Sequence, residues 1–161
     1  MHSPHPRSSA AIRGFTLLEL VVVIAIIAIL AAVVIGATSQ QKNAGGNAGV
    51  EQNLVNARSQ IALYYVNNNN SYLNACADAR IRKMVQAAAK AANITPSAAA
   101  YANTDVGDWN SEACHATAAA WAIWVPLRSS TSASPAAWCV DSTNASRQVT
   151  GSLASGAVAC P

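Results

Sequence analysis

An unbroken apolar run from Leu20 to Ile35 is the feature that most constrains this chain. With its flanking residues the apolar segment extends from Phe15 to Ala37, and Glu19, near its start, is the single charged residue inside it. As a helix rising about 1.5 Å per residue, the segment is long enough for the ~30 Å hydrocarbon core of a bilayer. We therefore expect a helix that spans a membrane.

The residues ahead of the apolar run set its orientation. Residues 1–14 are polar, contain no acidic residue and carry Arg7 and Arg13. By the positive-inside rule these charges stay in the cytoplasm, so the rest of the chain is exported. A secretory signal has a shorter apolar core that ends in a small-x-small cleavage site. Removal of the whole apolar run is therefore the less favoured interpretation.

Glu19 is costly inside a bilayer, and such residues are candidates for functional sites. In one interpretation its side chain reaches the lipid headgroups and has no further role. In the other it pairs with a positive group. Cleavage of the bond between Gly14 and Phe15 would create an α-amino group one helical turn away, and that charge would offset the desolvation of the carboxylate.

Residues 13–27, Arg-Gly-Phe-Thr-Leu-Leu-Glu followed by the apolar run, resemble the class III signal and N-terminal helix of type IV pilins and pseudopilins. The resemblance implies that a prepilin peptidase cuts after Gly14 and methylates Phe15. It also implies that Glu19 pairs with the N-terminal amine of a neighbouring subunit. The implied fold is α+β, a long N-terminal helix packed on a small antiparallel sheet with a short second helix, and no cofactor is expected.

This resemblance divides the chain into three parts. Residues 1–14 are a cleaved leader, residues 15–37 a helix for the membrane and the filament core, and residues 38–161 an exported head. The head includes the second half of the long helix, at about 50–66. There a stripe of apolar residues recurs at spacings of four and three, which predicts an amphipathic helix; its members are Val50, Leu54, Ala57, Ile61 and Tyr65. Glycines at 45, 46 and 49 predict a bend or a frayed section before it.

The head should continue with a second helix. Asn67–Asn70 is expected to end the long helix, because asparagine favours turns. The second helix is predicted from Cys76 to Ala92, before Pro96. Its basic residues are interpreted as a solvated face rather than a DNA contact, so binding of nucleic acid is possible but unsupported; they include Arg80, Arg82 and Lys83. Residues 97–117 are interpreted as a loop.

Alternating apolar residues predict strands in the last third of the chain. Ala118–Leu127 and Ala136–Asp141 have this period of two and should pair as an antiparallel hairpin. A third strand is expected at Gln148–Thr150 or at Ala157–Cys160. The tryptophans are expected in the core of this sheet.

Four cysteines follow the apolar run: Cys76, Cys114, Cys139 and Cys160. An even number with no CxxC pair in an exported segment favours two disulfides over a zinc site. Three connectivities are open. Sequential pairing, Cys76 with Cys114 and Cys139 with Cys160, is favoured because it ties the second helix to the loop and the tail to the sheet. The Cys139–Cys160 loop also resembles the disulfide-bounded region of many pilins.

The head holds residues for two kinds of chemical site. Asp105, Asp108 and Glu112 surround Gly107, and oxygen ligands at such spacings can bind calcium, as the major pseudopilins that the chain resembles do. The pattern is not an EF-hand, and a solvated acidic turn is the favoured interpretation. No GxSxG, Walker or HExxH motif is present, and the adjacency of Cys114 and His115 does not orient a nucleophile toward a base. We expect no enzyme.

The resulting prediction is a structural subunit of a type IV pilus. Its partners would be further copies of itself, the prepilin peptidase, the assembly machinery and, before assembly, the membrane. The chain would be a single-pass membrane protein first and part of an extracellular pilus afterwards. The alternative is a minor pilin or a secretion pseudopilin, which acts in filament priming, adhesion, DNA uptake or secretion.

Overall fold

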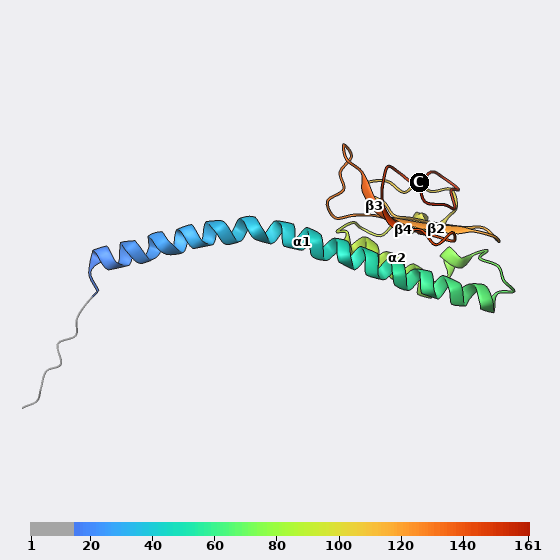
Figure 1. The fold of residues 1–161 in the computed structure, drawn as a ribbon, viewed down its shortest axis with the longest axis horizontal. Coiled ribbons are helices and arrows are strands. Elements are labelled where there is room, and N and C mark those ends of the chain that lie inside the picture. The colour runs from blue at the N-terminus through green and yellow to red at the C-terminus, as the bar shows by residue number, and fades with distance from the viewer. Residues whose placement is uncertain (1–14) are drawn as a thin grey trace, which may run out of the picture. The chain divides into compact units, whose positions relative to one another are not determined.

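The fold is α+β, with a long N-terminal helix and a four-stranded sheet (Figure 1). The computed structural model describes residues 15–161, without the side chains of residues 33–37 and 39. The chain divides into two compact units, of which the first ends at Ser39 and the second runs from Gln40 to Pro161. The helices are α1 (Leu17–Asn67), η1 (Ala75–Ala77), α2 (Ala79–Ala91) and η2 (Ala99–Tyr101), and the strands are β1 (Ala113–Ala116), β2 (Trp121–Pro126), β3 (Ala136–Asp141) and β4 (Ser146–Thr150).

The glycines between residues 45 and 49 do not interrupt α1, so the expectation of a frayed section there is wrong. The role of Gly46 and Gly49 is close packing. A Cβ at Gly46 would lie 2.7 Å from Cδ of Arg128 and 2.8 Å from the carbonyl oxygen of Ala91, and a Cβ at Gly49 would lie 3.0 Å from Cβ of Ala91. The glycines therefore allow α1 to approach the end of α2, which sequence spacing alone does not reveal.

The predicted end of the long helix and the predicted range of the second helix are close to what the structure shows. Asn69 and Asn70 adopt positive φ angles of 54° and 56° directly after α1, in the left-handed region that asparagine tolerates. The predicted second helix is present as α2, three residues shorter at its start. Asp78 caps it, since the Asp78 carboxylate accepts hydrogen bonds from the backbone N–H groups of Arg80 (2.9 Å) and Ile81 (3.2 Å).

The core of the second unit lies between the helices and one face of the sheet. Four members of the predicted α1 stripe are fully buried, and they share one cluster with residues of α2 and β2. Figure 1 shows the second half of α1 and α2 on the same side of the sheet. The main apolar members of the cluster are Val50, Leu54, Ala57 and Ile61 of α1, Ile81 and Val85 of α2, and Trp121, Ile123 and Val125 of β2.

The sheet is antiparallel throughout, in the order β1-β2-β3-β4. The predicted hairpin is confirmed as β2 and β3. Of the two candidate third strands, 148–150 lies in β4, whereas 157–160 forms no strand. The assignment of all of residues 97–117 to a loop is wrong, because β1 pairs with β2 there. Every residue of β1 is buried, so the strand lacks the alternation by which a half-exposed strand is recognised.

The second face of the sheet is covered by loops and the C-terminal segment. Trp124 and Cys139 lie on this face with Leu153, which is 1% exposed. Gly107 and Leu153 exchange two backbone hydrogen bonds of 3.0 Å, and a Cβ at Gly107 would lie 2.8 Å from the Trp124 ring. Trp121 and Trp124 are thus buried on opposite faces, as core residues, but Trp109 is 44% exposed.

Two disulfides join this cover and the helices to the sheet. Cys76 of η1 is bonded to Cys114 of β1, and Cys139 of β3 is bonded to Cys160. This is the sequential pairing that the sequence favours, and among the described residues there is no free cysteine. Each closure restricts the unfolded chain, and for sequence separations of 38 and 21 residues the chain-entropy model gives about 3–4 kcal/mol per disulfide.

The C-terminal segment is also held by Asp141, which is 2% exposed. One carboxylate oxygen accepts a 2.8 Å bond from the N–H of Cys160. The other accepts bonds from the N–H (2.8 Å) and hydroxyl (2.7 Å) of Thr143 and from the N–H of Ala145 (3.3 Å). Burial alone would raise the pKa of Asp141, but these hydrogen bonds to the charged form outweigh it and lower the pKa.

The first prediction compares two neighbouring glycines of α1. At Gly45 nothing lies within 4 Å of an added Cβ, so Gly45→Ala should raise the free energy of unfolding by about 1 kcal/mol through helix preference. Gly46→Ala should instead lower it by about 1–3 kcal/mol, because the backbone carbonyl of Ala91 cannot move away easily. Chemical unfolding of the purified chain in detergent measures both. An equal gain in the two variants would contradict the close packing.

The second prediction concerns Asp141. Asp141→Asn should lower the free energy of unfolding at neutral pH by about 1–3 kcal/mol, since a buried charge-assisted network loses its acceptor charge. Because the folded pKa is depressed, the stabilisation is present above the unfolded pKa of about 3.9 and is lost as the pH falls through the folded value. When the free energy of unfolding is measured against pH, the variant should not show this loss of stability at low pH. Glu51→Gln, at an exposed position of α1, serves as the control and should change neither curve.

Candidate functional site

The first turn of α1 is closed by a reciprocal pair of residues, Thr16 and Glu19. The backbone N–H and the hydroxyl of Thr16 both donate to Oε2 of Glu19, each at 2.9 Å. In return the N–H of Glu19 donates to the Thr16 hydroxyl at 3.2 Å. This is a capping box, in which the helix-start hydroxyl and the carboxylate three residues later satisfy each other's backbone donors.

The capping box gives Glu19 a structural partner within its own chain. The sequence Thr16-Leu17-Leu18-Glu19 before an apolar run is the signature of such a box, so this role of Glu19 could have been recognised from the sequence. Both bonds use Oε2. Among the described residues, Oε1 has no hydrogen-bond partner, so it can still accept a donor from another molecule.

The rest of the first unit presents apolar side chains in all directions around the helix. Phe15 is 84% exposed, and every described side chain from residue 15 to 32 is exposed. In water this surface would be unfavourable by its area alone. The segment therefore needs an apolar environment, either lipid or the side chains of other helices.

Some expectations for this segment lie outside what the structure describes. Gly14, the expected cleavage position, belongs to the residues that are not described, as do Arg7 and Arg13. Within the described part of the chain, no helical stretch combines the length and the mean hydropathy that crossing a membrane requires.

The three acidic residues of the candidate calcium loop are not gathered at one point. Asp108 is used by its own turn, where Oδ1 accepts bonds from the N–H of Asn110 (2.8 Å) and the hydroxyl of Ser111 (3.1 Å). Glu112, in contrast, is completely buried. In the described residues, no group of three or more His, Cys, Asp or Glu could hold a metal ion. The calcium alternative with Asp105, Asp108 and Glu112 as ligands is therefore wrong, and the favoured interpretation as a solvated acidic turn is wrong for Glu112, whose side chain is buried.

Glu112 has an environment that the sequence did not indicate. Its Oε1 accepts bonds from the N–H of Ser97 (3.0 Å) and the hydroxyl of Tyr101 (3.4 Å). Burial raises the pKa of the Glu112 carboxyl, and the hydrogen bonds only partly oppose this rise. Burial also raises the pKa of Tyr101, to which the negative charge of Glu112 adds, so the phenol stays a donor.

The adjacent residues Cys114 and His115 have separate structural roles. Cys114 is bonded in a disulfide, and His115 is fully buried. The two ring nitrogens of His115 contact the carbonyl oxygens of Ala157 (2.8 Å) and Asp105 (2.9 Å). His115 thus ties the C-terminal segment and the acidic loop to β1, and neither side chain is free to act on a substrate.

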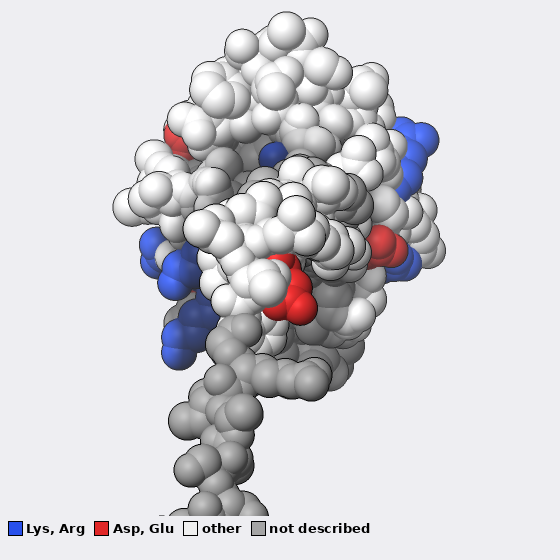
Figure 2. Space-filling model, turned by 90° about the vertical axis from the view of Figure 1, so that its left-hand side faces the viewer, with Lys and Arg blue, Asp and Glu red and all other residues white. Residues whose placement is uncertain are grey.

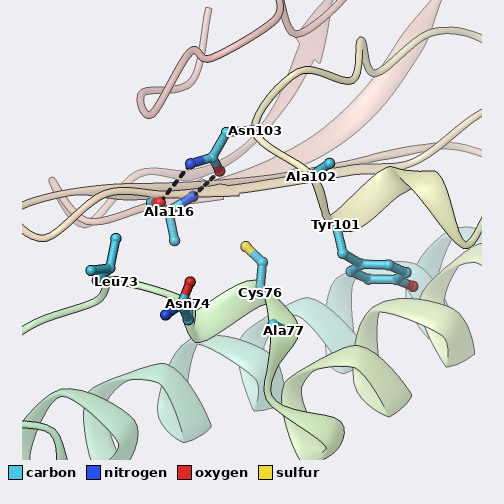
Figure 3. Close-up of a pocket in the computed structure, with 8 residues that line it drawn as sticks. All are labelled: Leu73, Asn74, Cys76, Ala77, Tyr101, Ala102, Asn103 and Ala116. Atoms are coloured by element: carbon cyan, nitrogen blue, oxygen red, sulfur yellow. Dashed lines mark hydrogen bonds between the residues drawn. The ribbon is translucent and has the colours of Figure 1, made fainter.

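A hollow of about 210 Å³ lies beside the Cys76–Cys114 disulfide (Figure 3). Asn103, which lines the hollow, bonds both backbone groups of Ala116. The side-chain amide of Asn103 donates to the carbonyl oxygen of Ala116 at 2.8 Å, and the N–H of Ala116 donates to the side-chain oxygen of Asn103 at 2.8 Å. This occupies backbone groups at the open edge of β1, which would otherwise be available to another strand. The Tyr101 phenol is the one ionisable group among the residues that line the hollow.

The basic side chains on one face of the molecule are scattered. On the face drawn in Figure 2, Lys and Arg lie in several separate places on a surface made mostly of other residues. Within the predicted basic cluster of α2, Arg82 is engaged with the ring of Tyr101, 4.8 Å from the ring centroid.

Comparison with known proteins locates the family signal at the N-terminus. Residues 10–35 match the model of the prokaryotic N-terminal methylation motif, which is characteristic of the class III signal of type IV pilins and prepilins. Comparisons with curated proteins and with solved structures gave no match. The match supports a structural protein of the type IV pilin-like or pseudopilin kind, and the long helix on a small antiparallel sheet is consistent with the pilin fold. The motif implies processing by a prepilin peptidase, a membrane-inserted precursor and assembly into pili.

The third prediction tests the capping box. Thr16→Val removes the hydroxyl that accepts from Glu19 and should increase hydrogen exchange at the amides of the first turn of α1, whereas amides near Leu54 should be unchanged. Thr16→Ser keeps the hydroxyl and should behave like the parent chain. Amide exchange of the chain in detergent, followed by NMR, distinguishes the two. Equal exchange in both variants would show that the box does not hold the turn.

Proposed function

We propose that this chain is a structural subunit of a type IV pilus filament. The precursor inserts with residues 15–37 across the membrane and the leader on the cytoplasmic side. A prepilin peptidase then cuts after Gly14 and methylates the new amino terminus at Phe15. The subunits polymerise through packing of their N-terminal helices, with the heads outward. The match of residues 10–35 to the methylation motif carries this proposal.

The surface of the first unit supports polymerisation through this helix. Apart from Thr16, Glu19 and Thr38, its described side chains are apolar, and all of them are exposed, so lipid can surround them before assembly and neighbouring helices can replace the lipid afterwards. Helices that exchange lipid for one another gain packing contacts without exposing apolar surface to water.

Glu19 supplies the polar part of the proposed interface. Its Oε2 serves the capping box while Oε1 remains an available acceptor. The α-amino group created at Phe15 is a donor of opposite charge, and in a bundle of apolar helices each group would be poorly solvated without the other. We expect the amine of one subunit to donate a hydrogen bond to Oε1 of Glu19 in its neighbour, while the neighbour's own capping box stays intact.

The fourth prediction separates insertion from assembly. Glu19→Ala should leave the amount of chain in the membrane fraction unchanged or higher, because it removes a polar group from the apolar segment. Sheared surface filaments should be strongly reduced, because the neighbour's amine loses its partner. Glu51→Ala, which removes an exposed carboxylate of α1 in the second unit, should give normal filaments. Electron microscopy and immunoblots of both fractions measure this, and normal filaments in Glu19→Ala would refute the role of Glu19.

Processing and abundance give a direct test of the proposed role. Mass spectrometry of the mature chain should find Phe15 as the first residue, carrying one additional methyl group. An intact leader would overturn the processing step. Sheared filaments should consist mainly of this chain. Recovery in trace amounts only would instead favour a minor pilin or a pseudopilin.

A further inference from the structure

A small cavity in the second unit brings together two acidic side chains that the proposed filament role does not use. The cavity has a volume of about 90 Å³ and is lined by residues around η2 and by the loop of residues 105–112. Asp105 and Glu112 both belong to this lining. Both lie far along the chain from Glu19 and the methylation motif, so the cavity is separate from the proposed assembly site.

Each of the two carboxyl groups has one buried oxygen without a hydrogen-bond partner among the described residues. The Glu112 side chain is completely buried, and its Oε1 accepts bonds from Ser97 (3.0 Å) and Tyr101 (3.4 Å), but its Oε2 accepts none. In Asp105 the buried atom without a partner is Oδ2. Burying a carboxylate oxygen without a donor is costly, and two ionised carboxylates on one cavity repel each other.

The groups packed around the cavity do not supply the missing donors. From η2, the Tyr101 phenol serves only Oε1 of Glu112. From α2, Arg82 faces the Tyr101 ring, 4.8 Å from its centroid. From β1, the two ring nitrogens of His115 contact the carbonyl oxygens of Ala157 and Asp105. None of these side chains bonds the two unpartnered oxygens, so the cavity lacks one hydrogen-bond donor.

We propose that Glu112 is a neutral carboxylic acid at neutral pH, with a proton on Oε2 donated into the cavity toward Oδ2 of Asp105, and that this contact is pH-sensitive. A protonated carboxyl group is both a donor and an acceptor, so Oε1 can keep its bonds from Ser97 and Tyr101. A single proton gives Oε2 a role as donor, gives Oδ2 a charge-assisted bond and removes the repulsion. Burial, which raises the pKa of Glu112, acts in the same direction.

The contact stabilises the head only while the proton is bound. Because the pKa of Glu112 is raised in the folded chain, its stabilisation is fully present below the unfolded pKa of about 4.3 and is lost as the pH rises through the folded pKa. Asp141, whose pKa is lowered, has the opposite sign and loses its stabilisation as the pH falls. The two buried acids therefore limit the stability of the head from opposite sides of the pH scale.

The part of the head that should loosen on deprotonation can be named. Ser97 precedes η2, whereas Asp105 begins the turn that carries Gly107 against the ring of Trp124. Loss of the proton places two charges on the cavity between these segments. Amides of the loop should then exchange faster, while amides near Leu54, in the helix core, should not.

Two variants isolate the proton and its acceptor. Glu112→Gln imitates the protonated acid, because its carbonyl oxygen can accept from Ser97 and Tyr101 while its NH₂ group donates toward Asp105. This variant should keep the loop closed at every pH at which the chain is folded. Asp105→Asn removes the negative charge that favours the proton, so Glu112 should ionise at a lower pH than in the parent chain.

Asp108 offers a matched control for loop charge. It lies between the two acids in sequence, but its Oδ1 is occupied by the turn bonds from Asn110 and Ser111, and it does not line the cavity. Asp108→Asn changes the net charge of the loop as much as Asp105→Asn does. A shift in one variant but not in the other therefore reports the contact across the cavity.

The test follows the ionisation of Glu112 by ¹³C NMR of the full purified chain in detergent, labelled at the glutamate side-chain carboxyl and kept in EDTA so that only protons bind. The chain has three glutamates, Glu19, Glu51 and Glu112, and the Glu112 signal is the one lost in Glu112→Gln. At pH 7 this signal should be that of a neutral acid. Asp105→Asn should lower the proton affinity of Glu112 at least about tenfold, a fall of about one pH unit in the midpoint. Asp108→Asn should leave the midpoint unchanged.

An ionised Glu112 in the parent chain at pH 7 would overturn the proposal. So would an unchanged midpoint in Asp105→Asn, or a shift in Asp108→Asn equal to that in Asp105→Asn. Near-ultraviolet circular dichroism and disulfide mapping show whether each variant is folded. If Glu112→Gln does not fold, Glu19→Gln and Glu51→Gln assign the other two signals, and the titrations of the parent chain and of Asp105→Asn still decide.

Discussion

The burial of one apolar stripe of α1 against the sheet is the interaction on which the second unit depends. Val50, Leu54, Ala57 and Ile61 are each fully buried, and β2 presents Trp121, Ile123 and Val125 to the same cluster. Because β2 lies between β1 and β3 and every one of its residues is buried, it needs cover on both faces. The helices supply only one of the two covers, so the remainder of the chain has to supply the other.

That second cover has little regular structure and is therefore fixed by individual bonds. The Cys139–Cys160 disulfide, the Asp141 carboxylate and the ring of His115 each join the C-terminal segment to a strand. The Gly107–Leu153 bridge adds the acidic loop to the same layer. Loops cannot satisfy their backbone groups through a helix or a ladder, so buried polar side chains such as those of His115 and Asp141 bond the backbone of this second cover.

Patterns that depend on neighbours in the sequence could be predicted, and those that depend on distant partners could not. The α1 stripe, the Asn67–Asn70 stop and the β2–β3 hairpin follow from local periodicity and turn preference. β1 is a strand because β2 pairs with it, and the helix continues through Gly46 because Ala91 and Arg128 lie against it. Nothing in the sequence distinguishes Asp108 from Glu112, yet one closes a surface turn and the other is fully buried. The Thr16–Glu19 capping box could have been predicted from the sequence, since both residues lie in one helical turn.

The two ends of α1 lie in different surroundings, and the difference in their apolar patterns allows one helix to suit both. From Val50 onward the helix needs only one apolar stripe, because the sheet of its own chain covers it. Over the described side chains of residues 15–32 no side of the helix is covered by the chain itself, and nearly all of these side chains are apolar. The main polar group among them is the carboxylate of Glu19, whose Oε2 already accepts bonds from Thr16. In the proposed filament each subunit therefore brings one free acceptor, Oε1 of Glu19, and one free donor, the amine of Phe15. A contact between two different groups on identical subunits is heterologous, so it can repeat along an open helical array instead of ending in a closed dimer.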